Sequence, residues 1–533
     1  MEAHAKQVER ESAESYILRA GVFEQEGSSV DEYAVLIEGL RAHYDNYELY
    51  FMLGLYYRYR NADQAFLCFE NAIRYCDEPE DEKIIRDAIE GIKDRARVRG
   101  TSIVIVSYND FELCRECIRA IRRYYHKDDI EIVVVDNAST DEALLRYLRE
   151  QKEKNKKFIL IENDKNEGFP AGCNKGLEAA NSENDVLFLN NDAVLMPNAL
   201  FWMKMGLYAD KRNGASGAVT NCAPSQEVSM ESLQPYLQNA PMDETRPITS
   251  ISSDVKEHRW WRTISLDSAL ETAKSYAKDH NVPMWNPFEV RCRLTGFAVL
   301  LRREALNNVM MKDSEERKWL FDERFSPGYF EDDDLGIRLC LAGYRQILCH
   351  NAFIYHHGGS GFADKTDAME ASREKFKEKW GFDIWNYTLL EEDKMNALMS
   401  AIAESDKRAS IDEDAGASRN QTDLKLYNRV LRILDISAGM GTTLSAIKYQ
   451  MPDSFTAGIT NVDVFAGLSK YMADDMISGN PELVTFPWPE HSFDFIILGD
   501  IPASASDPEK LLRKLHVYLK ENGQLINVIR ETD

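Results

Sequence analysis

Three short apolar runs in the first third of the chain constrain its fold more than any other feature. They read "SIVIVS", "IEIVVVD" and "KFILIE", and each is followed by a stretch with apolar residues at helical spacing. Strands that alternate with helices form parallel sheets, whose strands are covered on both faces and are therefore apolar without alternation. The sequence predicts a parallel, doubly wound α/β sheet that continues to about residue 353. A polar insertion of about residues 230–291 interrupts it, with a helix expected at "SLDSALETAKSYAKDHN".

Residues 1–98 have the apolar spacing of helices throughout. Small and aromatic positions on two successive expected helices resemble the tetratricopeptide pattern, with one residue fewer in the turn: Tyr50, Leu53, Gly54, Tyr57, Ala65, Phe69 and Ala72. Gly21 lies 33 residues before Gly54 and indicates a weaker, earlier copy. A plain helical hairpin bundle is the alternative. Repeats of this kind bind peptides or pack on neighbouring domains, so the resemblance implies a peptide partner.

Composition limits the class of protein. A chain of 533 residues is too long for one core, and its net charge of -25 argues against nucleic acid as the main partner. The polar start lacks the apolar core of a signal peptide, and no apolar run is long enough to span a bilayer. Nine scattered cysteines suggest reduced thiols, with Cys114 and Cys117 as a thiol pair on a helix rather than a zinc site. We expect a cytoplasmic protein, or one peripheral to the inner face of the membrane.

Polar side chains follow three of the expected strands, at the point where each strand ends. Ligands of open parallel sheets bind beyond this edge. Any one of these groups could instead cap the next helix, but three on successive strands favour a shared site. The groups are Ser107 with Tyr108 and Asn109, Asp136 with Asn137, and the triplet Asn190, Asn191 and Asp192.

Seven segments between about residues 100 and 360 together resemble glycosyltransferase family 2, which comprises inverting enzymes of the GT-A fold. They are "SIVIVSYND", "IVVVDNASTDE", "NEGFPAGCNKGLEAA", "FLNNDAVL", "LTGFAVLLRREAL", "FSPGYFEDDDLGIRLCLAGY" and "YHHGGSGF", in the order of the family. The branch that transfers rhamnose or builds cell-surface glycans is the most similar. The resemblance implies a nucleotide-sugar donor, a divalent metal ion and a glycan, lipid-linked glycan or protein acceptor.

The resemblance assigns donor-binding roles to residues at the strand ends. Asp136 would contact the nucleotide base, with Ser107 and Tyr108 beside it. The loop "NEGFPAGCNKG" would line the donor site by close backbone approach. The full set implied for the donor is Ser107, Tyr108, Asp136, Asn166, Gly168, Asn190, Asn191 and Arg338.

The resemblance also implies the metal ligands. Asp192 matches the last acid of the D-x-D motif, while Asn190 replaces the first acid with a neutral oxygen donor. Mg²⁺ or Mn²⁺ would then be held largely by Asp192 and the donor phosphates. Either His356 or His357 could add an imidazole ligand, which suits Mn²⁺ better than Mg²⁺. A hydrogen-bonded histidine near the core is the alternative.

The stretch "GYFEDDDLGIRLCLAGY" places four acids at the start of an expected helix. One or two acids there would only complement the helix dipole, and four exceed that need. In the family the aspartate of the Glu-Asp pair is the general base, which here is Asp332, next to Glu331. Asp334 and Arg338 would order the site or contact the donor phosphates. The implied reaction is a single displacement with inversion.

The C-terminal pattern resembles class I methyltransferases, which use S-adenosylmethionine. "ILDISAGMG" matches their glycine-rich first loop through Asp435, Gly439 and Gly441. Two departures weigh against that cofactor. Thr460 and Asn461 stand where the ribose-binding acid is usually found, and the pattern ends after a fifth strand, so we expect the domain to be truncated or inactive.

The sequence thus predicts four parts: helices in residues 1–98, a GT-A domain in 99–390, a linker in 391–425 and an incomplete methyltransferase-like domain in 426–533. The predicted function is metal-dependent inverting transfer of a sugar from a UDP or dTDP donor. A bifunctional glycosyltransferase and methyltransferase, a sugar nucleotidyltransferase, and a scaffold with degenerate enzyme domains are the alternatives.

Overall fold

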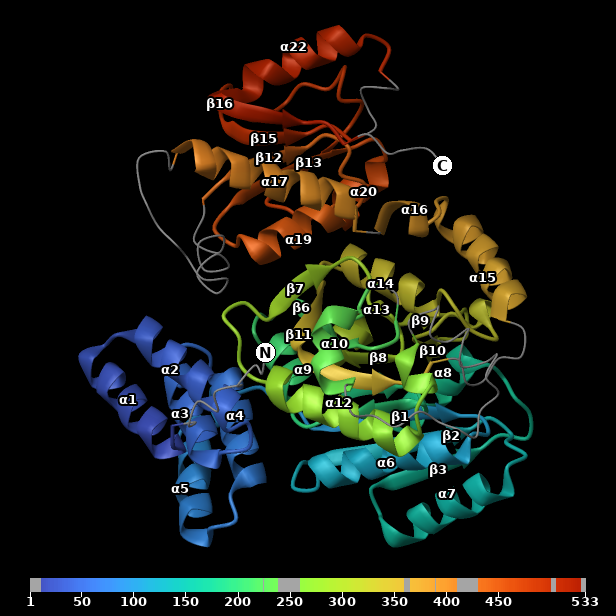
Figure 1. Ribbon diagram of the computed structural model, residues 1–533. Helices are drawn as coiled ribbons and strands as arrows, with labels where there is room; N and C mark the ends of the chain where they lie inside the picture. The colour runs from blue at the N-terminus through green and yellow to red at the C-terminus, as the bar shows by residue number, and fades with distance from the viewer. Residues whose placement is uncertain are drawn as a thin grey trace, which may run out of the picture. The chain divides into compact units, whose positions relative to one another are not determined.

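The computed structural model describes residues 11–223, 225–237, 259–358, 365–388, 390–409, 430–499 and 505–528 (Figure 1). The chain forms two compact units. The first comprises residues 1–287, 294–332 and 347–372, and the second comprises residues 288–293, 333–346 and 373–533. The N-terminal helices therefore share a unit with most of the predicted GT-A domain. No helix in the described ranges is both long and apolar enough to cross a membrane.

The N-terminal helices pack as successive pairs. They are α1 (Ala13–Glu26), α2 (Ser29–Ala42), α3 (Tyr47–Tyr57), α4 (Ala62–Tyr75) and α5 (Pro79–Glu90). Helices α3 and α4 approach closely at Gly54, where a Cβ atom would lie 2.3 Å from the ring of Phe69. Gly21 has open space instead, and the close approach of the first pair occurs at Gly39, against Tyr16. The structure thus shows helical hairpins, while the tetratricopeptide assignment stays a prediction.

A buried asparagine fastens these helices to the sheet domain. Asn198, 1% exposed, accepts a hydrogen bond from the Tyr75 hydroxyl at 2.8 Å and donates one to the Tyr50 hydroxyl at 2.9 Å. Arg74 adds two bonds to the carboxylate of Asp128, at 3.0 and 2.6 Å. Buried polar groups that are satisfied only across an interface hold that interface in one arrangement.

The central sheet has the strand order β3-β2-β1-β4-β8-β6-β11-β5. Its elements, with their helices, are β1 (Thr101–Ser107), α6 (Phe111–Tyr124), β2 (Ile130–Asp136), α7 (Glu142–Lys154), β3 (Phe158–Glu162), α8 (Phe169–Ala179), β4 (Asp185–Leu189), β5 (Ala193–Leu195), α9 (Ala199–Leu207), β6 (Asn213–Thr220), β8 (Ala298–Leu301), α13 (Arg303–Val309), β9 (Met311–Lys312), β10 (Lys318–Trp319), η2 (Glu323–Phe325), α14 (Glu331–Leu341) and β11 (Arg345–His356). Helices α6 and α7 lie on one side of β1 to β3 and α8 on the other, as right-handed crossovers require.

The prediction of a parallel sheet is correct for only part of these strands. Strands β1 to β4 pair in parallel, but β8 runs antiparallel to both β4 and β6, and β11 runs antiparallel to β5. A strand buried on both faces has the same apolar pattern in either direction, so the sequence pattern could not reveal this reversal.

The predicted insertion contains α10 (Met230–Leu237), η1 (Trp260–Arg262) and α12 (Leu266–His280), and α12 matches the expected helix. Residues 238–258 lie outside the described ranges. Cys114 and Cys117 are buried on α6.

The second unit contains a sheet of parallel strands in the order β14-β13-β12-β15-β16. Its elements are β7 (Phe288–Arg291), α15 (Lys365–Trp380, from residue 373), α16 (Trp385–Thr388), α17 (Glu392–Ala409), β12 (Arg432–Asp435), α19 (Thr442–Gln450), β13 (Phe455–Thr460), α20 (Asp463–Leu468), β14 (Asp475–Ser478), β15 (Phe493–Ile497), α22 (Pro508–Tyr518) and β16 (Leu519–Ile526). Most of α14 also belongs to this unit.

The predicted linker, residues 391–425, differs from the structure in its first half. Helix α17 occupies residues 392–409, and Leu398 and Ile402 pack in the core of the second unit with Ile433 and Leu444. The charged, small-residue composition concealed an apolar stripe at helical spacing. Residues 410–425 lie outside the described ranges.

The close approach of α3 and α4 can be tested by adding one methyl group. We expect Gly54→Ala to lower the free energy of unfolding by about 1–3 kcal/mol, because the new Cβ atom would overlap the Phe69 ring. Gly21→Ala is the matched control, since nothing lies within 4 Å of the added atom. It should raise stability by about 0.5–1 kcal/mol. Denaturant unfolding followed by circular dichroism measures both changes, and equal effects would contradict this packing.

Candidate functional site

The three polar strand ends predicted from the sequence lie at one edge of the central sheet. Strands β2, β1 and β4 are neighbours, and Ser107 at the end of β1 is paired in register with Asp136 at the end of β2. Asn190 follows directly on β4. Ser107 is fully buried and lies 3.6 Å from the Cys114 sulfur, whereas Tyr108 is partly exposed. The expected shared edge is therefore present.

Asp136 organises the loop that follows β2. Its carboxylate, 1% exposed, accepts hydrogen bonds from the backbone N–H and the hydroxyl of Ser139, at 3.0 and 2.5 Å. The next residue, Asn137, donates to the carbonyl of Gly168 at 3.1 Å. Its own side-chain oxygen accepts from Asn163 at 2.8 Å. This network ties the end of β2 to the start of α8.

The glycine at the start of α8 is required by its surroundings. Gly168 has a φ of +86°, and a Cβ atom there would lie 2.9 Å from the Ser326 hydroxyl oxygen. The side-chain oxygen of Asn166 accepts a hydrogen bond from the Gly168 N–H at 2.9 Å. With glycine at residue 168, the backbone of this loop can therefore approach a ligand more closely than it could with any other residue there.

Asp192 forms an ion pair with one of the two candidate histidines. Its Oδ1 atom lies 3.3 Å from Nε2 of His356, and both side chains are largely buried. Burial lowers the pKa of His356, but the Asp192 carboxylate outweighs it and raises that pKa to about 10. The other ring nitrogen, Nδ1, lies 2.5 Å from the carbonyl oxygen of Cys222. Because a carbonyl only accepts, Nδ1 carries a proton and Nε2 is the atom directed at Asp192.

His357 has a different environment. Its Nδ1 atom lies 2.9 Å from the Tyr355 hydroxyl, and its backbone carbonyl accepts a hydrogen bond from the indole of Trp261. Its backbone N–H donates to the carbonyl of Asp192. The imidazole that pairs with the Asp192 carboxylate is that of His356.

An acid that the sequence analysis did not select lies near Asp192. The pKa of Asp110 is raised, first by burial and then by the carboxylate of Asp192. Asp110 has a φ of +66° at the start of α6, two residues after Tyr108. Asp110 is the last residue of "SYND" and follows the end of β1, so it could have been selected with the other polar strand ends. Its place directly before a helix made it resemble an ordinary helix cap. The side chains of Asn190 and Asn191, directly before Asp192 in the chain, are partly exposed.

A short segment before β8 joins the candidate base to the Asp192 region. The backbone N–H of Gly296 donates to Oδ2 of Asp332 at 2.7 Å. The carbonyl of Phe297 accepts from the N–H of Asn190 at 2.9 Å, and its ring stacks on His356 with centroids 5.0 Å apart. Residues 296 and 297 therefore contact both acidic segments that the sequence singled out.

The four acids at the start of α14 have distinct environments. Asp332 is partly exposed, whereas the other three are buried. Asp333 pairs with Arg293 at 2.5 Å. Burial, and then the charge of Glu331, raises the pKa of Cys173 on α8, which places Glu331 near that helix.

Asp334 is fully enclosed within the second unit. It accepts from Arg338 at 3.0 Å, from Lys379 at 2.5 Å and from the Trp380 indole at 2.9 Å. A carboxylate bound by three donors is suited to fixing the helix rather than to exchanging a proton. Arg338 is likewise engaged by Asp334.

The described residues include no cluster of three or more His, Cys, Asp or Glu side chains arranged to hold a metal ion. The chain offers two candidate ligand atoms, Oδ1 of Asp192 and, once a cation displaces the proton it carries toward Asp192, Nε2 of His356. Mg²⁺ and Mn²⁺ sites of phosphate-transferring enzymes commonly use one or two protein ligands and take the others from substrate phosphates and water. The donor set of this chain fits that kind of site.

The predicted cofactor loop of the second unit has the expected backbone conformation, but its acid, Asp435, forms an ion pair with a lysine of the chain. Gly439 and Gly441 have φ values of +52° and +83°, in the left-handed region. Asp435 is buried and pairs with Lys394 of α17 at 3.0 Å. A cavity of about 430 Å³ lies beside this loop and is bordered by Thr460 and Asn461, which supply no carboxylate for a ribose. These two residues thus lack the ribose-binding acid that an S-adenosylmethionine site usually has at this position.

Comparison with known proteins concerns the central part of the chain. Residues 102–248 match the family model of glycosyl transferase family 2. A poly(ribitol-phosphate) beta-glucosyltransferase of Bacillus spizizenii is 36% identical over 101 residues, which are 19% of this chain and 16% of that protein. An uncharacterized glycosyltransferase of Methanocaldococcus jannaschii is 31% identical over 100 residues, 19% of this chain and 34% of that protein. The chain therefore spans well under half the length of either relative.

Two solved structures show weaker likeness. A mannosyltransferase of Pyrobaculum calidifontis, in complex with GDP-Man and Mn²⁺, is 17% identical, with a TM-score of 0.31 over 50% of this chain and 58% of that one. TarS 1–349 of S. aureus, in complex with UDP-GlcNAc, is 16% identical, with a TM-score of 0.31 over 52% and 65%. TM-scores this low say nothing about the function of the chain. Residues 102–248 are thus the part of the chain that is similar to glycosyl transferase family 2.

Proposed function

We propose that this protein transfers a sugar from a nucleotide-sugar donor to an acceptor hydroxyl, with inversion at the anomeric carbon. The observation that carries the proposal is the pair of contacts made by residues 296 and 297. Gly296 binds the partly exposed carboxylate of Asp332, and Phe297 contacts His356 and the residue two before Asp192. The family match agrees with this reading.

Asp332 is the proposed general base. It would accept the proton of the acceptor hydroxyl while that oxygen attacks the anomeric carbon and the bond from that carbon to the diphosphate breaks. The electron pair of that bond leaves with the diphosphate, so no covalent intermediate with the protein forms. The hydrogen bond from Gly296 orients the carboxylate for this role.

Asp192 and His356 are the proposed protein ligands of a divalent cation. When bound, Mg²⁺ or Mn²⁺ would supply positive charge that stabilises the departing nucleoside diphosphate. The pKa of Asp110 is raised first by burial and then by the Asp192 carboxylate, and a cation beside the two acids would relieve the second of these effects. The loop around Asn166 and Gly168, with Ser107, Tyr108 and Asp136, would hold the nucleotide.

The donor is proposed to be a UDP- or dTDP-sugar. A cell-surface glycan is the proposed acceptor class, and the B. spizizenii relative is named for a poly(ribitol-phosphate) acceptor. Protein acceptors, a peptide partner at the N-terminal helices and a cytoplasmic location stay predictions. We propose no methyl transfer, because Lys394 engages Asp435.

The proposed function can be tested by incubating the full chain with UDP- and dTDP-sugars and Mn²⁺ and measuring nucleotide release and binding. We expect metal-dependent binding of a pyrimidine nucleotide and slow hydrolysis of its sugar ester. Asp332→Asn should lower turnover by about 10²- to 10⁴-fold, because it removes the proton acceptor, while calorimetry shows nucleotide affinity nearly unchanged. Retained turnover would refute the assignment of the base. A chain that binds no nucleotide sugar would refute the function.

The contact between Gly296 and Asp332 gives a second prediction. A Cβ atom at residue 296 would lie 3.2 Å from both Cβ and Oδ2 of Asp332, closer than such atoms normally approach. Gly296→Ala should therefore displace the carboxylate and lower kcat by about tenfold or more, with an unchanged Kd for nucleotide. A variant that unfolds at the same denaturant concentration as the wild type but keeps full kcat would contradict the proposed orientation.

The cation site gives a third prediction. Asp192→Ala should remove the increase in nucleotide affinity that Mn²⁺ provides, because it deletes the carboxylate ligand. Asp77→Ala is the control, since that side chain is 95% exposed and lies on the N-terminal part of the chain. Calorimetric titration of UDP or dTDP with and without Mn²⁺ measures the difference. Equal metal dependence in both variants would exclude Asp192 as a ligand.

A further inference from the structure

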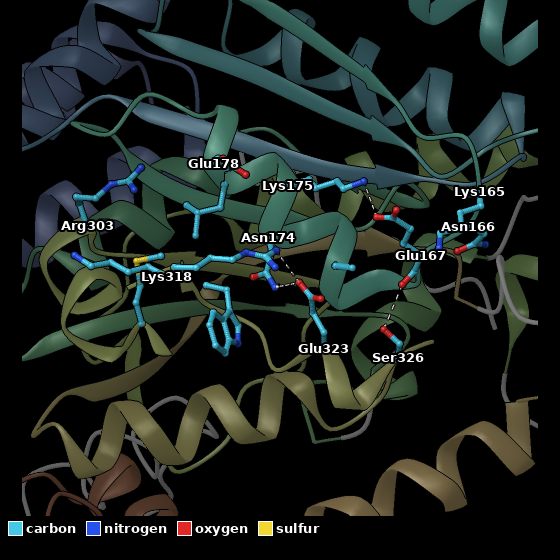
Figure 2. Close-up of a pocket in the computed structure, with 15 residues that line it drawn as sticks. Lys165, Asn166, Glu167, Asn174, Lys175, Glu178, Arg303, Lys318, Glu323 and Ser326 are labelled. Atoms are coloured by element: carbon cyan, nitrogen blue, oxygen red, sulfur yellow. Dashed lines mark hydrogen bonds and ion pairs between the residues drawn. The ribbon is translucent and has the colours of Figure 1, made fainter. Parts of the chain in front are cut away.

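A large cavity of the first unit lies along helix α8 (Figure 2). It has a volume of about 850 Å³ and is lined by three parts of the chain. These are the loop of residues 165–167, the outer side of α8, and the stretch from α13 through the β9–β10 hairpin to Ser326. The loop "NEGFPAGCNKG", which lines part of this cavity, was predicted from the sequence to line the donor site. We name this cavity the α8 groove.

The α8 groove leads from one edge of the sheet to the other. Its Asn166 end adjoins Gly168, whose carbonyl is bonded to Asn137 at the strand ends of the proposed donor site. At its other end Arg303 is fixed to the carbonyl of Asn184, directly before β4. Between these ends runs α8, whose 11 residues extend about 16 Å. A ligand lying in the groove would therefore be extended, with one end near the proposed donor site.

The wall of the groove is ordered by a buried amide. Asn174 donates to the carbonyl of Phe321 at 2.9 Å and to Glu323 at 3.0 Å. Its side-chain oxygen accepts from the N–H groups of Leu320 and Phe321, at 3.1 and 2.9 Å. These four bonds hold the strand that carries Trp319 against α8. The shape of the groove is thus fixed by the protein before any ligand binds.

The charge of the groove is opposite to that of the chain. Its lining includes five cationic residues and three carboxylates, in a protein with 64 basic and 89 acidic residues. One carboxylate, Glu167, is neutralised by Lys175 at 2.6 Å. Figure 2 shows Lys165 and Lys318 near opposite ends of the groove, and both residues are exposed. Such local positive charge in an acidic protein favours an anionic ligand.

We propose that the α8 groove binds the acceptor, and that the acceptor is a linear carbohydrate polymer carrying negative charges at intervals. This inference rests on the proposed function. Spaced cations suit phosphodiester or carboxylate groups, and the partly exposed indole of Trp319 offers a face for a sugar or polyol unit between them. The polymer runs along α8, and its reacting end reaches the strand-end edge.

Binding of defined polymers to the full-length protein tests the proposal. The probes are a glycerol-phosphate polymer, polygalacturonate as the carboxylate polymer, neutral dextran and polyglutamate, each titrated at low salt. The test variant is Arg317→Glu with Lys318→Glu, on the exposed β9–β10 hairpin. The matched control is Lys156→Glu with Lys211→Glu, which changes the net charge equally at exposed positions that do not line the groove.

We expect the wild type and the control to bind at least one anionic carbohydrate polymer and to ignore dextran, and the groove variant to bind at least tenfold more weakly. Whether the phosphate or the carboxylate polymer binds identifies the charged group. Equal affinity of both variants, no binding of either anionic carbohydrate polymer, or tighter groove-dependent binding of polyglutamate would overturn the proposal.

Hydrolysis of the nucleotide sugar is measured in parallel, and it should be the same in all three proteins. Intact hydrolysis without groove-dependent binding refutes the acceptor groove alone. Absent hydrolysis in the wild type refutes the proposed function instead, so the two failures are distinguishable.

Discussion

The hydrogen bond from Gly296 to Asp332 depends on the direction of one strand. Strand β8 runs antiparallel to β4, with Ala298 paired to Leu189, so the start of β8 lies at the edge where β4 ends. Residues 296 and 297 therefore emerge beside Asn190 and can contact Asp332 and His356. A parallel β8 would begin at the opposite edge of the sheet, and the acid of α14 would have no backbone donor there. The contact between Gly296 and Asp332 in the proposed site thus requires that β8 run antiparallel to β4.

Sequence patterns revealed the strands and their polar ends but not the elements that join them. The apolar runs before Ser107 and Asp136 predicted neighbouring strands correctly, because buried strands need no alternation. The same lack of alternation concealed the reversal of β8. Asp110 was missed because a single acid before a helix is usually a cap, and only the fold brings it near Asp192. Asn198 was missed because its partners lie more than 120 residues earlier in the chain.

The second unit shows how a local motif can be present while its long-range surroundings differ. The positive φ values of Gly439 and Gly441 follow from the local sequence, since glycine adopts this backbone readily. The partner of Asp435 is Lys394, 41 residues earlier, on a helix that the composition suggested was a linker. A buried carboxylate needs a cation or several donors, and here a residue of the chain supplies the cation. The acid that would mark a cofactor loop therefore stabilises the packing of α17.

The run "FEDDD" illustrates why residue type alone does not assign a role. Burying a carboxylate is costly unless cations or donors compensate it, so the buried acids of α14 must be paired. Arg293 forms an ion pair with Asp333. Arg338 and Lys379 form ion pairs with Asp334, and the indole of Trp380 donates a hydrogen bond to it. These pairs fix the first turn of the helix. Asp332 is the member that is partly exposed, and the backbone N–H of Gly296 donates a hydrogen bond to it. This difference in exposure is why, of the acids in the run, Asp332 is the one proposed as the general base.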